Sequence, residues 1–178
     1  MGAWLRAVEY FRRRSAPPEG RLAEAGVASG MRVADLGAGY GYYSFAAAKL
    51  VGPEGKVYAV EPDPKRAAEI RRRAGEAGAS NVVVVVAGAE DMGEIPDRGV
   101  DRAISMASFH HFADPAKALA EVSRVVRPGG EVYIRDLKAG RVFRHGSKSE
   151  GFRVVVASAF PQAEFEEGKG YLVARIRL

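Results

Sequence analysis

The sequence predicts a doubly wound α/β protein, a three-layer αβα sandwich around a seven-stranded, mostly parallel sheet whose last strand is antiparallel. Three observations lead to this fold. Short apolar runs alternate with helical patterns from residue 32 onward, one run is made only of valine, and the chain closes on a short glycine-containing connection. Strands that alternate with helices at this pitch are typical of a parallel sheet covered by helices on both faces.

The parallel strands are predicted from apolar runs that glycine, proline or charge bounds on each side. These runs are Arg32–Asp35, Lys56–Glu61, Val82–Ala87, Arg102–Met106 and Glu131–Asp136. The third run contains five consecutive valines, Val82 to Val86. An unbroken β-branched run of this kind is typical of a strand buried on both faces.

Helical patterns fill the intervals between these runs. The first extends over Tyr42–Leu50, and the second, Pro64–Ala77, places small and apolar residues on one face. A third covers Asp114–Val126, with Asp114 at the N-cap and Pro115 at the first helical position. Proline at that position and Asp at the cap are strong helix-start signals.

The end of the chain predicts one more helix and a hairpin. Ser147–Glu150 has the Ser-x-x-Glu pattern of a capping box, and Pro161 ends the helix that follows. Ala163–Glu167 and Tyr171–Leu178 then form strands joined by Gly168-Lys169-Gly170. A three-residue connection with two glycines predicts a hairpin, so the last strand is antiparallel to its neighbour.

The length of 178 residues predicts one domain. Within it we expect an N-terminal helical cap over residues 1–30, broken at Pro17-Pro18 and packed over the ligand edge of the sheet. A cofactor-binding core over residues 31–137 and a C-terminal helix and hairpin over 138–178 follow. Because charged residues interrupt the first fourteen positions and no apolar run is long enough to span a bilayer, neither a secretory leader nor a membrane segment is expected. The chain has no cysteine, and a cytoplasmic location is the default expectation.

Composition and charge leave two interpretations open. The chain has no Thr or Cys, one Asn and one Gln, and 28% charged residues. This predicts a thermophilic source, although a GC-rich genome also favours Arg, Ala, Gly and Val. The net charge of +5 either attracts nucleic acid or another anion, or reflects a solvated, salt-bridged surface. For Arg71-Arg72-Arg73 we expect a solvated surface.

The most informative stretch runs from Val33 to Tyr42, where a strand ends in Asp35 and glycine then occupies positions 37, 39 and 41. Glycine permits positive φ and close approach of a ligand to the backbone, and the N–H groups of the following helix face the loop. The next strand ends in Glu61, a carboxylate suited to ribose hydroxyls. Since ligands of such sheets lie at the carboxyl ends of the strands, these loops predict a site for a nucleoside-bearing cofactor.

Two cofactors suit this pattern. A dinucleotide fingerprint reads G-x-G-x-x-G, with a pyrophosphate at the helix N-terminus. Here the spacing is G-x-G-x-G, bulky Tyr42 and Tyr43 follow, and Asp35 precedes the loop by two residues. An acid at that position suits a cationic amine better than a pyrophosphate, which favours S-adenosylmethionine over NAD.

Longer segments carry a family resemblance. VADLGAGYGYYS resembles motif I of the class I, Rossmann-like S-adenosylmethionine-dependent methyltransferases, and VYAVEPDP resembles the acidic segment that follows it. DRAISMASFHHFADPAKALAEVSRVVRPGGEVYIRD resembles the fourth strand, His-rich loop, helix and Pro-Gly-Gly strand entry of the same family, especially of its small methyltransferase domain 11 group. The matches run in order over residues 32–136, and the resemblance implies a seven-stranded sheet with an antiparallel last strand.

The resemblance also implies roles for individual residues in binding S-adenosylmethionine, whose product is S-adenosylhomocysteine. The cofactor-binding residues implied for the methionine portion, the ribose, the adenine edges and the vicinity of the sulfur are Asp35, Gly37, Gly39, Gly41, Glu61, Pro62, Asp63, Ala89, Glu90 and Ser105. One position departs from the family pattern. Many relatives have Gly-Asp-Ala where this chain has Ala87-Gly88-Ala89, so Glu90 or Asp91 is expected to supply the carboxylate that reads the adenine.

Methyl transfer to an acceptor that loses a proton benefits from a general base. The resemblance places the acceptor over Ser105–Phe112, where His110 and His111 lie, and histidine titrates near neutrality. Asp136, at the end of the fifth strand, is a further catalytic candidate. The alternatives are packing within the loop for the histidines, and a helix cap or salt bridge for Asp136.

The predicted activity is methyl transfer to a small molecule at an O, N or C atom. The alternatives are an RNA or protein methyltransferase, with RNA held by Arg12–Arg14 and the basic segment 138–148, or a non-catalytic S-adenosylmethionine-binding module. The chain has no Asn/Asp-Pro-Pro-Tyr/Phe after the fourth strand and no cysteine, which argues against amino-directed adenine methylation and covalent 5-methylcytosine chemistry. No metal ion is expected, because no group of Asp, Glu and His stands out.

Overall fold

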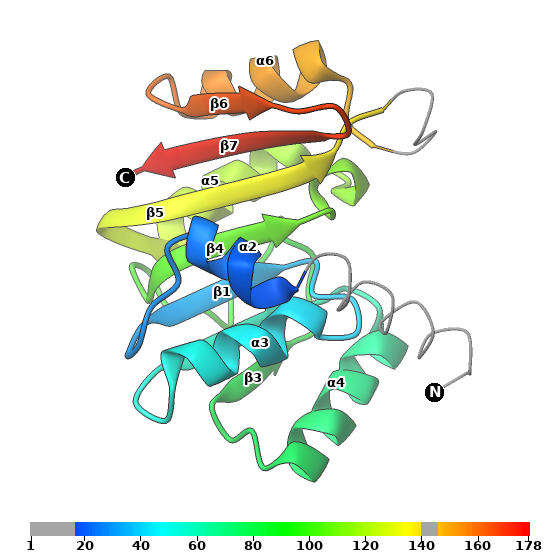
Figure 1. Cartoon of the computed structure of the whole chain (residues 1–178), viewed down its shortest axis with the longest axis vertical. Coiled ribbons are helices and arrows are strands. Elements are labelled where there is room, and N and C mark those ends of the chain that lie inside the picture. Colours follow the sequence, from blue (N-terminus) through cyan, green and yellow to red (C-terminus); the bar gives the residue numbers. More distant parts are fainter. Residues whose placement is uncertain (1–16, 140–145) are drawn as a thin grey trace.

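Seven strands form one sheet in the order β3-β2-β1-β4-β5-β7-β6 (Figure 1). The computed structural model describes residues 17–139 and 146–178. The strands are β1 (Arg32–Leu36), β2 (Lys56–Val60), β3 (Val82–Val85), β4 (Val100–Met106), β5 (Val126–Leu137), β6 (Glu164–Glu167) and β7 (Tyr171–Arg177).

The first five strands pair in parallel and the last two do not. β1 pairs in parallel with β2 and β4, β2 with β3, and β4 with β5. β7 lies between β5 and β6 and is antiparallel to both. The predicted fold class, a mostly parallel seven-stranded sheet with an antiparallel last strand, is confirmed.

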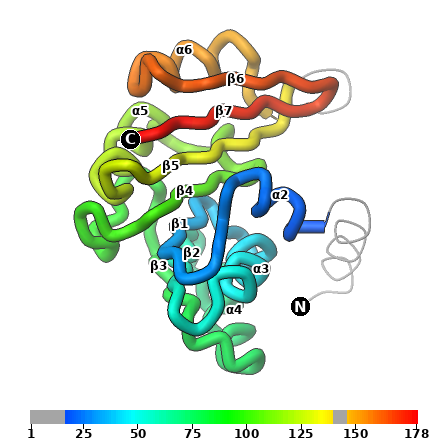
Figure 2. The backbone as a smooth tube through the Cα atoms, turned by 60° about the vertical axis from the view of Figure 1, so that its left-hand side comes forward, coloured from blue at the N-terminus to red at the C-terminus, as the bar shows by residue number. Residues whose placement is uncertain are grey.

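Helices cover both faces of the sheet. The helices are α2 (Pro18–Glu24), α3 (Tyr42–Val51), α4 (Pro64–Ala77), α5 (Pro115–Val125) and α6 (Ser149–Ala159), with a 3₁₀ turn, η1, at Phe109–His111. α2, α3 and α4 pack on one face, whereas α5 and α6 pack on the other (Figures 1 and 2). The odd-numbered residues of β1, β2 and β5 face the first layer, and the even-numbered residues face the second, as the two-residue period of a strand requires.

Several predicted element boundaries are confirmed, and two predictions are wrong. The helix at Pro64–Ala77 is observed with those bounds, and Asp114 caps α5 by accepting a hydrogen bond from the backbone N–H of Lys117 at 3.0 Å. The valine run is not a strand buried on both faces. It forms β3 at the edge of the sheet, and Val86 after it is 38% exposed. A β-branched run looks the same in sequence at an edge as at the centre.

The second wrong prediction concerns the capping box at Ser147–Glu150. α6 begins at Ser149, its N-cap is Lys148, and no side chain caps it. The hydroxyl of Ser147 instead donates a hydrogen bond to Asp136.

The N-terminal segment is described only in part. The helix that begins at Pro18, immediately after Pro17, agrees with a helix start at the proline pair. Arg12–Arg14 lies outside the described residues, as does most of the basic segment 138–148. Within the ranges that the structure describes, no helix is long and apolar enough to cross a membrane.

Candidate cofactor and acceptor site

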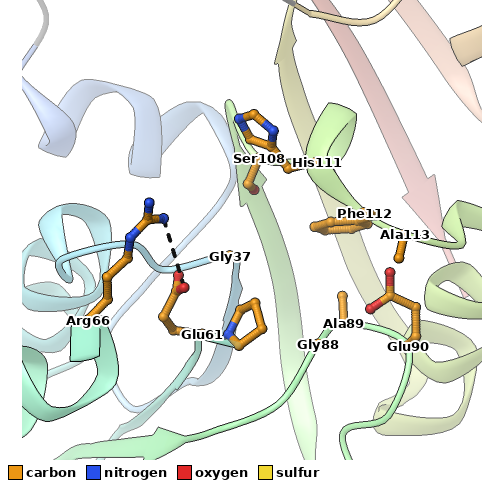
Figure 3. Close-up of a pocket in the computed structure, with 11 residues that line it drawn as sticks. Gly37, Glu61, Arg66, Gly88, Ala89, Glu90, Ser108, His111, Phe112 and Ala113 are labelled. Atoms are coloured by element: carbon orange, nitrogen blue, oxygen red, sulfur yellow. Dashed lines mark ion pairs between the residues drawn. The ribbon is translucent and has the colours of Figure 1, made fainter. Parts of the chain in front are cut away.

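A cavity of about 300 Å³ opens at the carboxyl ends of the parallel strands, where the chain connections of β1 and β4 diverge to opposite faces of the sheet. The loops after β1, β2, β3 and β4 each contribute to its wall (Figure 3). The lining residues are Gly37, Glu61, Pro62, Arg66, Gly88, Ala89, Glu90, Ser108, His111, Phe112 and Ala113. This is the position at which open α/β sheets bind ligands.

The loop after β1 depends on its three glycines. Gly37, Gly39 and Gly41 have φ values of +72°, +60° and +80°, a region that favours glycine. A Cβ atom on Gly37 would lie 2.6 Å from Cβ of Ser108, and one on Gly41 would lie 2.7 Å from the ring of Phe45. A Cβ atom on Gly39 would meet no atom within 4 Å. The outer two glycines therefore let the protein pack, whereas Gly39 leaves space open above the loop.

Glu61 joins the end of β2 to this glycine loop. Its Oε2 atom accepts a hydrogen bond from the backbone N–H of Gly39 at 2.8 Å, and its Oε1 atom accepts one from Asp63 at 3.0 Å. The residue is 3% exposed, and the guanidinium of Arg66 lies 3.9 Å from Oε1 (Figure 3). The carboxylate is thus fixed at the cavity wall with its orientation set by two backbone donors.

Asp35 lies behind the glycine loop, inside the protein. It is 2% exposed, and its carboxylate accepts a hydrogen bond from the hydroxyl of Ser44 in α3 at 2.6 Å. Burial raises the pKa of Asp35 to about 6 and the charge of Glu61 adds to this, although the bond from Ser44 opposes it. Asp35 is not among the residues that line the cavity.

The other end of the cavity holds a carboxylate at an unusual position. Oε2 of Glu90 occupies the space that a Cβ atom on Gly88 would need, so a side chain at position 88 would require the Glu90 carboxylate to move. Oε1 of Glu90 accepts a hydrogen bond from the backbone N–H of Asp114 at 3.1 Å. A carboxylate folded back from position 90 therefore lies beside position 88, where the resemblance implies an Asp.

Beside the cavity, the predicted catalytic candidates come together. Nδ1 of His110 lies 2.7 Å from Oδ1 of Asp136, and their side chains are 7% and 0% exposed. The rings of His110 and His111 are in contact, with centroids 3.9 Å apart and planes tilted by 45°, and His111 reaches the cavity (Figure 3). The second oxygen of Asp136, Oδ2, accepts a hydrogen bond from Ser147 at 2.6 Å. A buried carboxylate that holds one nitrogen of an imidazole leaves the other nitrogen to accept a proton.

The loop after β4 is tied to β1 through two serines. The hydroxyl of Ser105 lies 2.8 Å from that of Ser108, and Ser108 donates to the carbonyl of Leu36 at 2.6 Å. Ser105 is fully buried, so Ser108 rather than Ser105 lines the cavity. Between them Ala107 has a φ of +58°, which is uncommon for a residue other than glycine.

The structure separates the sequence-predicted residues into two groups. Those that line the cavity are Gly37, Glu61, Pro62, Ala89, Glu90 and His111. Those that lie beside or behind it are Asp35, Gly39, Gly41, Asp63, Ser105, His110 and Asp136. Asp63 caps α4 by accepting a hydrogen bond from the N–H of Lys65 at 2.8 Å. Among the residues with described positions, no group of three or more His, Cys, Asp or Glu could hold a metal ion.

Sequence reasoning missed Arg66 and Ala113 as lining residues, and it placed Ser108 and Phe112 only within the segment Ser105–Phe112 expected to face the acceptor. They follow the predicted strand ends within a few residues, and this proximity is the sequence feature that could have identified them as lining residues. The prediction of a solvated surface is wrong for Arg73. Its guanidinium donates to the carbonyl of Tyr40 in the glycine loop at 2.7 Å and packs over Phe45.

Comparisons with known proteins agree with this geometry. A family model described as a methyltransferase domain matches residues 34–134. The chain is 33% identical over 115 residues to an arsenite methyltransferase of Halobacterium salinarum, covering 64% of this chain and 29% of that protein. It is 33% identical over 119 residues to an aklanonic acid methyltransferase of a Streptomyces species, covering 67% and 52%. The chain therefore spans about half or less of the length of these relatives.

A solved structure matches over nearly the whole chain. The crystal structure of a SAM-dependent methyltransferase from Aquifex aeolicus superposes with a TM-score of 0.80 at 27% identity, covering 93% of this chain and 92% of that one. Because the superposition covers more than nine tenths of each chain, the similarity is not confined to the cofactor loops and includes the antiparallel end of the sheet.

Proposed function

This chain belongs to the S-adenosylmethionine-dependent methyltransferases, and we propose that it methylates a small molecule whose accepting atom loses a proton during the transfer. The buried pair of His110 and Asp136 beside the cavity carries the proposal. A methyl acceptor that keeps its proton, or has none, needs no base. A hydroxyl or an acidic C–H does need one, and a hydroxyl is the acceptor that this pair suits best.

The residues around the cavity suit the cofactor. Its volume of about 300 Å³ lies at the lower end of the range for small-molecule sites. Pro62, Ala89 and Phe112 offer apolar walls to a flat base, and the buried carboxylate of Glu61 faces the same space. When bound, S-adenosylmethionine supplies a methyl group that its positive sulfur activates for in-line displacement.

We assign the binding roles as follows. The open backbone at Gly39 lets the methionine portion approach, and the carboxylate of Asp35 supplies negative charge behind the loop for its ammonium group. Glu61 accepts the ribose hydroxyls on the lone pairs that its two backbone donors leave free. Glu90 accepts from the amino group of adenine.

We assign the proton to His110. Because a carboxylate can only accept, Oδ1 of Asp136 receives the Nδ1–H of His110, and Nε2 is left with a lone pair. The acceptor's proton passes to Nε2 as the acceptor atom bonds to the methyl carbon, and Asp136 stabilises the imidazolium that forms. His111 packs on the ring of His110 and limits its rotation.

Two measurements test the proposal. Calorimetry should show binding of S-adenosylhomocysteine and none of NAD or NADP, and the reverse would favour a dehydrogenase. A panel of hydroxylated and thioether small molecules, assayed for S-adenosylhomocysteine release, should give turnover with hydroxyl acceptors only. Turnover confined to acceptors without an acidic proton would contradict the role of His110.

The same assays separate the alternatives. If RNA is the acceptor, filter binding should show a steep fall in affinity with rising salt, because phosphate contacts release counterions. Of the two lysines in the described part of the basic segment, Lys138 forms an ion pair with Glu167 and Lys148 is exposed. A non-catalytic binding module would bind S-adenosylhomocysteine but release none with any extract or acceptor.

A further inference from the structure

We infer that Ser147 is a positioning residue for His110 and acts through the carboxylate of Asp136. The inference rests on the proposed function, in which His110 takes the acceptor's proton. Its basis is a continuous chain of two short hydrogen bonds, from the Ser147 hydroxyl to Oδ2 of Asp136 at 2.6 Å and between Oδ1 and the His110 ring at 2.7 Å.

Ser147 is held in place by its backbone. Its N–H donates to the carbonyl of Leu137 at 2.9 Å, and its own carbonyl accepts from the N–H of Ala139 at 2.9 Å. These two bonds join Ser147 to the residues that directly follow Asp136 at the end of β5. The backbone bonds therefore fix the position of Ser147 relative to Asp136, and its hydroxyl bonds directly to the carboxylate. Since α6 takes no side-chain cap, the hydroxyl has no competing role in that helix.

The carboxylate needs this second donor. Asp136 is 1% exposed, so water cannot substitute freely at the oxygen that His110 does not use. A buried carboxylate oxygen without a donor is costly, and the group would turn to share its other oxygen or admit water. Either response changes the direction in which Oδ1 faces Nδ1 of His110. The ring of His111 lies against that of His110, with centroids 3.9 Å apart and planes tilted by 45°, and this contact restricts the ring without selecting its tautomer.

If Ser147 positions Asp136, it also determines which ring nitrogen of His110 carries the hydrogen. A serine that only filled space would have no effect on that tautomer. With Oδ1 fixed as the acceptor, neutral His110 carries its hydrogen on Nδ1 and leaves Nε2 bare. Loss of the Ser147 hydroxyl should let the ring exchange between tautomers. The effect should appear in the imidazole ¹⁵N resonances, which distinguish a protonated ring nitrogen from a bare one.

The test is ¹⁵N NMR of His110 in the intact chain, in wild type and in Ser147→Ala, Ser147→Cys and Ser147→Thr. Wild type and Ser147→Thr, which keeps the hydroxyl, should show Nδ1–H with Nε2 bare. In Ser147→Ala the tautomers should shift from wild type toward the form with hydrogen on Nε2, because a carboxylate that turns away no longer accepts the Nδ1–H of His110. Ser147→Cys, with a similar volume and a weak donor, should lie between them and provides a readout if the alanine variant does not fold.

The matched control is Ser149→Ala, because Ser149 is two residues away and its hydroxyl bonds to Glu167 on the surface. This variant should leave the His110 resonances unchanged. If Ser147→Ala keeps the wild-type tautomer, or if wild-type His110 carries its hydrogen on Nε2, the inference is wrong. Calorimetry with S-adenosylhomocysteine on the same samples is independent of this result. Failure of wild type to bind it overturns the proposed function and leaves the NMR result standing.

Discussion

The hydroxyl of Ser44 donates a hydrogen bond to the carboxylate of Asp35 at 2.6 Å, across the buried contact between α3 and β1. One hydroxyl does not replace the hydration that the carboxylate loses, and the pKa of Asp35 accordingly rises to about 6. The protein therefore keeps a charge at neutral pH in a place where folding alone disfavours it. A cationic group of a ligand would stabilise this carboxylate by forming an ion pair with it.

We expect Asp35→Asn to stabilise the ligand-free protein above pH 6 and to weaken S-adenosylhomocysteine binding. Because the folded protein binds the Asp35 proton more tightly than the unfolded chain, the stability due to this group is present below about pH 4 and is lost as pH rises through about 6. A rise from 3.8 to about 6 corresponds to roughly 3 kcal/mol, so a gain of about 1–3 kcal/mol in unfolding free energy is expected at pH 8.

Urea unfolding at pH 8 and pH 4 and calorimetry measure these effects. The difference in unfolding free energy between Asp35→Asn and wild type should become smaller as the pH falls. In wild type the dissociation constant of S-adenosylhomocysteine should rise about tenfold per pH unit below about 6. Glu54→Gln, which changes an exposed carboxylate outside the cavity, should do neither. An affinity for S-adenosylhomocysteine that does not depend on pH between 5 and 8 would show that the charge of Asp35 does not contribute to cofactor binding.

We expect Gly39→Arg to abolish cofactor binding and leave the protein folded. A side chain at position 39 enters open space and clashes with no atom, so the cost to stability is the φ of +60°, about 1–2 kcal/mol. The matched control is Gly78→Arg, because Gly78 has a φ of +62°, also faces open space, and caps α4. Both variants should unfold at similar urea concentrations, and only Gly39→Arg should lose affinity in calorimetry.

Sequence reasoning located those parts of the site that depend on local pattern. The glycine loop and Glu61 follow strand ends directly, so their spacing reveals them. His110 follows the carboxyl end of β4, and Asp136 is the penultimate residue of the neighbouring strand β5, which is why these two separately chosen candidates meet. Contacts that depend on packing had no such signal.

Ser147 illustrates what the sequence could not disclose. Its pattern satisfies a capping box, and only the bridge between Lys138 and Ser147 brings its hydroxyl to Asp136 instead. Ser108 likewise supports the glycine loop through the carbonyl of Leu36, 72 positions away. In both cases the serine hydroxyl donates a hydrogen bond to a group outside its own local segment. Local sequence patterns do not indicate which of the available acceptors such a hydroxyl binds.

We expect Glu61→Gln to lower both stability and affinity. The two carboxylate oxygens of Glu61 accept from the N–H groups of Gly39 and Asp63, and a glutamine can offer an oxygen to only one of them. One half-buried N–H then faces an NH₂ group, which costs up to about 1–3 kcal/mol. Thermal unfolding and calorimetry measure the two effects, with the exposed Glu54→Gln as the control. Affinity retained despite lower stability would mean that Glu61 supports the loop and does not bind the ribose.

Glu90 is the carboxylate that we propose reads the adenine. We expect wild type to bind S-adenosylhomocysteine more tightly than S-inosylhomocysteine, whose 6-oxo group cannot donate to the carboxylate of Glu90. Glu90→Ala should reduce this preference about tenfold, since a hydrogen bond to a charged group is lost. Gly88→Asp alone should weaken binding, because Oε2 of Glu90 already occupies the space that the new side chain needs.

The double variant Gly88→Asp with Glu90→Ala should recover the preference, because it returns a carboxylate to the vacated space from position 88, where the resemblance implies an Asp. Calorimetry with both ligands on the four proteins measures the preference, and Glu94→Ala, an exposed carboxylate outside the cavity, is the control. The single Glu90 variant also loses the bond to the N–H of Asp114, so both variants that lack Glu90 share that defect. Recovery therefore reports the carboxylate alone. A double variant that discriminates no better than Glu90→Ala would show that the two positions are not interchangeable and that Glu90 serves only to hold the start of α5.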